Sequence, residues 1–354
     1  MRCERENTAS VRSFFTSLAS YPVLLAILVL QAACGSPDTK PLEFSGPTMG
    51  SHYSIKIPFA PADLPAPQLE QGISAILDDI NRKMSTYLAD SELSLINSAE
   101  TTDWIPVSAE LYEVLATAQD ISGQTGGAFD ITVGPLVNLW GFGPDKQPGQ
   151  IPEPDRIDEA RKHTGYRLLE LRVSPRAVRK HDPRIYIDLS GIAAGYAADR
   201  VAKYLETRLI EHYLIDITGE IRARGVNQQQ QIWRVGIEKP LIDRRDVQYI
   251  VALDNMGLTT AGDYRNFFVH DGRRYSHTID PATGWPVAHD LTSVTVLDRS
   301  AMTADALDTA FMVMGPQRAL EFAEQHHVPA LFILNHNNEF TGQHSSPFSA
   351  YLIK

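Results

Sequence analysis

The stretch QYIVALDNMGLTTAGDYRNFFVHDGRRYSHTI, residues 248–279, has the pattern from which the fold class is predicted. Short segments rich in β-branched and aromatic residues follow one another along it. Strands are expected at 248–254, 266–270 and 274–279, and short connections between consecutive strands favour antiparallel pairing. We expect the remaining strands of this half of the chain at 184–189, 213–217, 232–237, 292–297 and 329–334.

Amphipathic patterns predict the helices that pack against these strands. A first strand at 52–59 precedes a helix over 66–84, where apolar residues recur every three or four positions. Ser108 can cap a second helix, and the Pro- and Gly-rich segment 143–154 is expected to be a surface loop that can act as a lid. Further helices are expected at 192–207, 303–313 and 316–326. The order predicts an α+β fold with largely antiparallel sheets packed with helices.

The first part of the chain predicts its destination. A basic start is followed by the apolar run Val23–Leu30, which is too short to span a bilayer and is typical of a signal peptide. Ala32 and Ala33 then lead to Cys34, a pattern that resembles the lipidation site of a bacterial lipoprotein. Gln31 departs from it, because an aliphatic residue is usual there. An ordinary cleaved signal peptide is the alternative.

The expected organisation follows from this signal. Residues 1–33 form the signal peptide, 34–47 a lipid-anchored tether, and 48–354 a single domain. Gly35 follows the cysteine, so the simple inner-membrane retention signal, an aspartate, is absent. Cys3 would be removed with the signal, which leaves no disulfide. The formal net charge of −11 and the scattered basic residues argue against non-specific nucleic-acid binding.

A histidine and a group of acidic residues are the first candidates for chemistry. His277 lies near the end of a predicted strand, and the turn Asp280–Gly284 would fix its direction, so the imidazole can accept a proton from a hydroxyl. Asp305 and Thr309 share one face of a predicted helix, with Asp308 beside them, and their oxygens suit Mg²⁺ or Ca²⁺. A structural histidine and acids stabilised by the helix dipole are the alternatives.

Two turns of small residues are weaker candidates. Asp188–Tyr196 (DLSGIAAGY) connects a predicted strand to a predicted helix, and backbone N–H groups at such a helix start can bind an anion. The same residues would also suit close packing of a helix on a sheet. Gly126–Pro135 (GGAFDITVGP) carries one aromatic residue and one acid, Phe129 and Asp130, which by themselves fit a core side chain and a cap.

With these pieces in order, the chain resembles the ApbE family, the FAD:protein FMN transferases. The matching segments run through the whole chain beyond the signal peptide. They are Thr48–Gly50, Met84–Tyr87, Gly127–Asp130, Val133–Leu136, Asp188–Leu189, Gly191–Ala193, Gly195–Ala197, Gly219–Glu220, Thr260, Gly262–Arg265, His277–Pro281, Thr283–Gly284, Ala304–Asp305 and Thr309–Ala310. The resemblance implies a single catalytic unit with an FAD pocket between subdomains.

The resemblance also implies a reaction, in which the FMN half of FAD moves to a Thr or Ser hydroxyl of an exported or membrane protein and AMP is released. His277 would be the base, and Asp305, Asp308, Thr309 and the Gly191 carbonyl would bind Mg²⁺. The FAD pocket would be lined by Met49, Tyr87, Ala128, Phe129, Asp130, Asp188, Ala194 and Ile279. Acceptors of the family include subunits of ion-pumping redox complexes, and we expect the protein at the inner membrane, facing the periplasm.

Three positions depart from the family pattern. Ala194 stands where lysine is common, Ala261 where serine is common, and Thr218 where glycine is common. A nearby cation such as Arg265 can replace the lysine. Two other activities remain open: an Mg²⁺-dependent FAD pyrophosphatase, in which water replaces the acceptor, and a non-catalytic FAD-binding lipoprotein. A generic secreted phosphoesterase is disfavoured, because the sequence has no dense His/Asp two-metal cluster.

Overall fold

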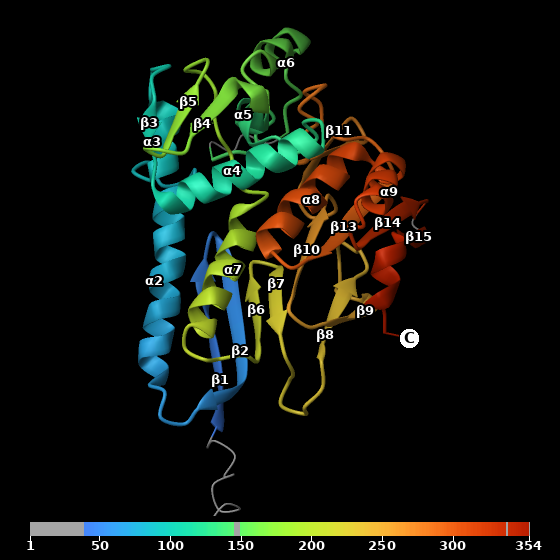
Figure 1. Ribbon diagram of the computed structural model, residues 1–354. Helices are drawn as coiled ribbons and strands as arrows, with labels where there is room; N and C mark the ends of the chain where they lie inside the picture. The colour runs from blue at the N-terminus through green and yellow to red at the C-terminus, as the bar shows by residue number, and fades with distance from the viewer. Residues whose placement is uncertain (1–38, 145–148, 338, 354) are drawn as a thin grey trace, which may run out of the picture. The chain divides into compact units, whose positions relative to one another are not determined.

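The computed structural model describes residues 39–144, 149–337 and 339–353 (Figure 1). The predicted signal peptide, the predicted lipidation site Cys34 and the start of the predicted tether lie outside these residues. Within them, no helix has the length and apolar character needed to cross a bilayer. Residues 40–354 form one compact unit.

An eight-stranded sheet forms the centre of this unit. In spatial order its strands are β1 (Thr39–Thr48), β2 (Ser51–Pro61), β6 (Tyr213–Ile217), β7 (Glu220–Arg224), β10 (Met256–Gly262), β13 (Leu291–Asp298), β14 (Ala330–His336) and β15 (Glu339–His344). Every pairing from β2 to β15 is antiparallel. The predicted α+β class with largely antiparallel sheets is therefore confirmed.

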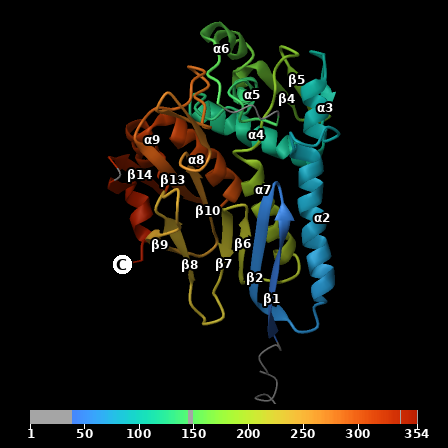
Figure 2. The ribbon, with the colours of Figure 1, turned by 180° about the vertical axis from the view of Figure 1, so that it is seen from behind.

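Helices cover one face of the sheet, and a hairpin covers the other (Figures 1 and 2). The helices are α2 (Ala66–Met84), α7 (Ala193–Glu206), α8 (Ala301–Met314) and α9 (Pro316–Gln325). The hairpin consists of β8 (Trp233–Glu238) and β9 (Val247–Leu253), whose buried side chains join a second apolar cluster with Leu258 and Leu297 of the sheet. Because β13 lies between these layers, Leu291–Leu297 is buried without alternation.

Smaller elements lie beyond one end of the eight-stranded sheet, in the upper part of Figure 1. They are α3 (Glu92–Ser98), α4 (Ala109–Gln124), α5 (Gly134–Leu139), α6 (Pro154–Arg161), the sheet of β3 (Ile105–Pro106), β5 (Ala177–Lys180) and β4 (Leu169–Arg172), and the hairpin of β11 (Phe267–His270) and β12 (Arg273–Ser276). Stacked rings support this hairpin: Tyr275 lies 5.2 Å from Phe268 and 5.7 Å from Trp140 between ring centroids. The hairpin therefore packs on stacked aromatic rings.

The structure corrects three predicted segments. No strand forms at 184–189, because the side chain of Asn97 replaces a neighbouring strand: it donates to the Ile187 carbonyl at 2.9 Å and accepts from the Ile187 N–H at 2.7 Å. The described part of the tether predicted over 34–47 belongs to β1, which takes the edge of the sheet beside β2. The predicted loop at 143–154 ends one residue early, since Pro154 begins α6.

Candidate active site

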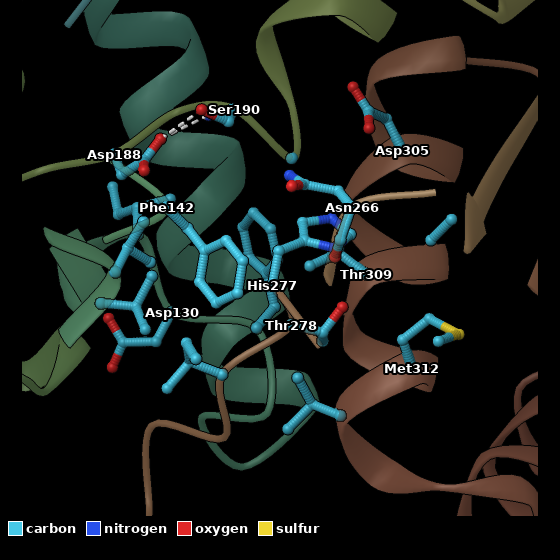
Figure 3. Close-up of a pocket in the computed structure, with 18 of the residues that line it drawn as sticks. Asp130, Phe142, Asp188, Ser190, Asn266, His277, Thr278, Asp305, Thr309 and Met312 are labelled. Atoms are coloured by element: carbon cyan, nitrogen blue, oxygen red, sulfur yellow. Dashed lines mark hydrogen bonds between the residues drawn. The ribbon is translucent and has the colours of Figure 1, made fainter. Parts of the chain in front are cut away.

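A cavity of about 440 Å³ lies beside α8 (Figure 3). Of the site residues predicted from the sequence, the cavity is lined by Tyr87, Ala128, Phe129, Asp130, Asp188, Gly191, His277, Ile279, Asp305, Asp308 and Thr309. Met49 and Ala194 are not among its lining residues. Residues 40–354 form one compact unit, as expected for a single catalytic unit, and the cavity lies between elements of this unit.

The two predicted residues outside the lining have other surroundings. Met49 occupies the turn between β1 and β2 with a φ of 47° and packs partly buried against the main apolar cluster. Ala194 lies in the first turn of α7 and is half-buried. Neither position contributes charge or a polar side chain to the cavity.

His277 follows directly after β12, so the strand predicted over 274–279 ends one residue before it. Its Nδ1 lies 3.1 Å from the Asn266 carbonyl oxygen, which can only accept a hydrogen bond. Nδ1 therefore carries the proton, and Nε2 keeps its lone pair. Phe142 lies edge-on at 6.3 Å between ring centroids. Burial lowers the pKa of His277, so the ring is a neutral proton acceptor near neutral pH.

A group of carboxylates lies on the α8 side of the cavity. Asp305 Oδ2 accepts a hydrogen bond from the Gly195 N–H at 2.9 Å, and Thr309 Oγ1 lies 3.4 Å from Asp308 Oδ1. Burial raises the pKa of Asp305 well above its usual range, and the nearby charge of Glu220 raises it further. Burial raises the pKa of Asp308 in the same way. Desolvated carboxylates this close are costly to ionise without a neighbouring cation.

Gly191 faces this group from the start of α7. A Cβ at this position would lie 2.8 Å from Thr309 Oγ1, so only glycine lets the backbone approach the hydroxyl this closely. Within residues 39–144, 149–337 and 339–353, no three His, Cys, Asp or Glu side chains could hold an ion by themselves. An ion here would also need oxygens such as the Thr309 hydroxyl, a backbone carbonyl or a bound phosphate.

Asp130 and Asp188 shape the opposite wall. Asp130 accepts hydrogen bonds from the Thr132 N–H and hydroxyl, at 2.8 and 2.6 Å, and from the Tyr166 N–H at 2.7 Å. Asp188 accepts from the Ser190 N–H and hydroxyl, at 2.9 and 2.5 Å (Figure 3). The two predicted turns are therefore held in place by their own acids. The Asp188 N–H also donates to the Ile131 carbonyl at 2.7 Å, which joins one turn to the other.

The cavity is rich in carboxylates and poor in cations. Among the lining residues that the structure describes there is no lysine and no arginine. Arg265, which we considered as a replacement for the lysine missing at Ala194, is outside the lining and pairs with Glu238 at 2.5 Å. A polyanionic ligand would therefore depend on bound cations or on backbone N–H groups.

Sequence reasoning missed several lining residues. Glu220 lay within a matching segment but received no role, and Asn266 directly follows another such segment. Phe142 immediately precedes the Pro- and Gly-rich loop, which was the only signal available for it. Their surroundings include His277 and Asp305, and these relations form only when the chain folds.

Comparisons with known proteins identify relatives of the whole domain. The model of the ApbE family matches residues 49–332. The FAD:protein FMN transferase of Vibrio cholerae serotype O1 is 42% identical over 337 residues, covering 95% of this chain and 100% of that protein. The flavin transferase ApbE structure from Vibrio cholerae covers 89% of this chain and 100% of its own at 41% identity, with a TM-score of 0.82. The apo flavinyl transferase ApbE of Pseudomonas stutzeri covers 88% and 96% at 39% identity, with a TM-score of 0.81.

Proposed function

The chain belongs to the ApbE family, and on this basis we propose that it is an FAD:protein FMN transferase. The observation that carries the proposal is the cavity itself, where a neutral histidine with a bare Nε2 shares one space with buried carboxylates on α8. A base and a cation-binding group are the two parts that transfer of a phosphoryl-linked group to a hydroxyl requires. Pure binding of FAD would not need the base.

In the proposed reaction, an acceptor hydroxyl oxygen attacks the phosphorus of the FMN half of FAD. A new P–O bond to the acceptor forms, the P–O bond to the AMP half breaks, and AMP leaves. His277 Nε2 takes the hydroxyl proton, while the Asn266 carbonyl holds the Nδ1–H and stabilises the imidazolium that results. The acceptor is a Thr or Ser of an exported or membrane protein, such as a subunit of an ion-pumping redox complex.

We assign Mg²⁺ to Asp305, Asp308, Thr309 and the Gly191 carbonyl. The assignment is supported by the hard oxygen donors and by the raised pKa of both carboxylates, which a cation would relieve. When bound, the ion would neutralise charge on the pyrophosphate and the leaving AMP. The absence of lysine and arginine from the described lining makes this neutralisation more important here.

FAD would occupy the rest of the cavity. Tyr87, 63% exposed at the rim, and Phe129, 3% exposed in the wall, offer ring faces at two depths. Asp130 and Asp188 keep the two turns in shape, and Ala128 and Ile279 supply apolar surface. Met49 and Ala194 would act on FAD only from outside the lining.

The cellular location is inferred from the sequence. The apolar run before Cys34 supports export and lipidation of that cysteine, which would tether the domain to the inner membrane, facing the periplasm. An exported acceptor protein would meet the enzyme there.

Mass spectrometry of an acceptor tests the proposed activity. The purified enzyme is incubated with FAD, Mg²⁺ and an acceptor subunit that does not yet carry flavin, and the acceptor is expected to gain the mass of one FMN while AMP appears in equal amount. A parallel acceptor whose target Thr is changed to Val should gain nothing. Release of free FMN and AMP with no covalent flavin on the acceptor would replace transfer by pyrophosphate hydrolysis.

The rate of transfer should fall in acid with a midpoint below pH 6.5, the ordinary pKa of histidine. Only the neutral imidazole accepts a proton, and burial lowers the pKa of His277, so the ring stays neutral to a lower pH. Single-turnover rates between about pH 4.5 and 8 would locate the midpoint. A midpoint above 6.5, or an identical acid limb in a His277→Ala variant, would contradict this role.

Ala194→Lys should tighten FAD binding about fivefold. The described cavity lining has no lysine or arginine, so an added cation nearby would attract the FAD phosphates, and such an attraction is worth about 1 kcal/mol at a partly exposed position. Quenching of flavin fluorescence would measure the dissociation constant. The gain should shrink in high salt, which screens the added charge. Ala194→Gln, similar in length but neutral, is the control, and an equal gain in that variant would rule out the electrostatic cause.

A further inference from the structure

Helices α7 and α8 each provide a carboxylate that accepts hydrogen bonds near the N-terminal end of the other helix. Asp199 of α7 accepts hydrogen bonds from the Ser300 hydroxyl at 2.8 Å, the Ala301 N–H at 3.0 Å and the Met302 N–H at 3.1 Å. In return, Asp305 of α8 accepts from the Gly195 N–H in the first turn of α7 at 2.9 Å. Each helix thus satisfies free N–H donors near the start of the other.

The two helices are in backbone contact at this point. A Cβ on Gly195 would lie 2.3 Å from the Ala301 carbonyl oxygen, so glycine is required for the approach. Arg222 of β7 holds Asp199 from below, with Nε 3.4 Å from Asp199 Oδ1, while its Nη2 donates to Asn255 Oδ1 at 2.7 Å. Asp199 itself is not among the cavity-lining residues. Its carboxylate therefore connects α7, α8 and β7 without facing the ligand.

We propose that Asp199 is a positioning residue that sets the spacing between the two halves of the cation site. The proposal rests on the function proposed above. One half of that site, Gly191, leads into α7, and the other half, Asp305, Asp308 and Thr309, lies on α8. A hard cation such as Mg²⁺ tolerates little change in the distances between its oxygen ligands. Whatever fixes α8 against α7 therefore fixes the site.

Other bonds at the start of α8 lie within its own stretch of chain, although the Ser300 hydroxyl takes part in one of them and also donates to Asp199. Ser300 Oγ accepts from the Thr303 N–H at 3.2 Å, and Asp298 Oδ1 accepts from the Ser300 N–H at 2.9 Å. These bonds stabilise the first turn of α8 but do not join it to α7. Asp199 differs because its bonds cross between the helices, and this difference provides a matched control.

Binding of Mn²⁺, an oxygen-seeking probe that is visible by electron paramagnetic resonance, tests the proposal without FAD or acceptor. Asp199→Ala should weaken Mn²⁺ binding about 10- to 100-fold, the range for loss of a supporting shell. Asp298→Ala should change it less than about threefold, although it also removes a bond near the start of α8. Circular dichroism would establish that both variants are folded at the temperature used.

Asp199→Asn is a second variant that tests the proposal if Asp199→Ala does not fold. Asparagine keeps an acceptor for the Ala301 N–H but turns an amide N–H₂ toward the Met302 N–H, so intermediate weakening is expected. Wild-type affinity in the folded Asn and Ala variants, or equal weakening in Asp298→Ala, would overturn the proposal, as would a wild type that binds no Mn²⁺. The acceptor assay reports separately on flavin transfer, so a wild type that binds Mn²⁺ without transferring FMN would refute only the proposed function.

Discussion

His277→Ala is expected to lower the rate of flavin transfer about 10²- to 10⁴-fold, the usual contribution of a general base. The imidazole is the only histidine in the described cavity lining, and its Nε2 is left free by the Nδ1 contact with Asn266. FAD affinity should change little, because the base acts on the acceptor hydroxyl and the FAD phosphates depend on the cation. Single-turnover attachment of FMN to the acceptor would measure the rate, and flavin fluorescence the affinity.

His270→Ala is the matched control for this prediction. His270 ends β11 in the hairpin that leads to His277, but its side chain is 42% exposed and it does not line the cavity. Its replacement should leave the transfer rate within about twofold of wild type, since it meets neither acceptor nor FAD in the proposed reaction. Retention of wild-type turnover by His277→Ala would remove the base from the mechanism.

Asp305→Asn should have opposite effects on activity and on stability. Transfer should fall about 10²- to 10³-fold, because a bound ion supplies several kcal/mol of charge stabilisation. Without Mg²⁺ the variant should unfold at a higher temperature than wild type. The raised pKa of Asp305 means that ionising it in the fold costs stability at neutral pH, and asparagine removes this cost while its amide oxygen can still accept from Gly195.

The sign of the pH dependence gives a second measurement. A carboxyl whose pKa is raised by folding binds its proton more tightly in the native state, so wild type without Mg²⁺ should gain stability as pH falls from neutral through that pKa. Asp305→Asn should show a weaker gain. Thermal unfolding with and without Mg²⁺ would test both points, with the exposed Asp271→Asn as control. If Mg²⁺ stabilised Asp305→Asn as much as wild type, the ion would not bind at this carboxylate.

Local patterns predicted many of the elements to within a few residues. The apolar stripe of 66–84 coincides with α2, and the predicted strands 213–217 and 248–254 correspond to β6 and β9. These segments bury a regular subset of side chains, which leaves a period in the sequence. The strand at 184–189 failed because its apolar residues are buried by irregular contacts, with Asn97 replacing a partner strand. The sequence of residues 184–189 does not show whether their backbone will pair with a strand or with the side-chain amide of a residue elsewhere in the chain.

The candidate site divides in the same way. Motifs and periodicity, which are properties of short segments, were enough to predict the family, the antiparallel class and a minority of the residues that line the cavity. Packing of the folded chain places Glu220 beside Asp305, sets the proton on His277 through Asn266, and joins α7 to α8 through Asp199. These relations arise when separate segments pack together. Burial sets the charge state of a side chain and distance sets the spacing of ligands, and both exist only in the folded chain.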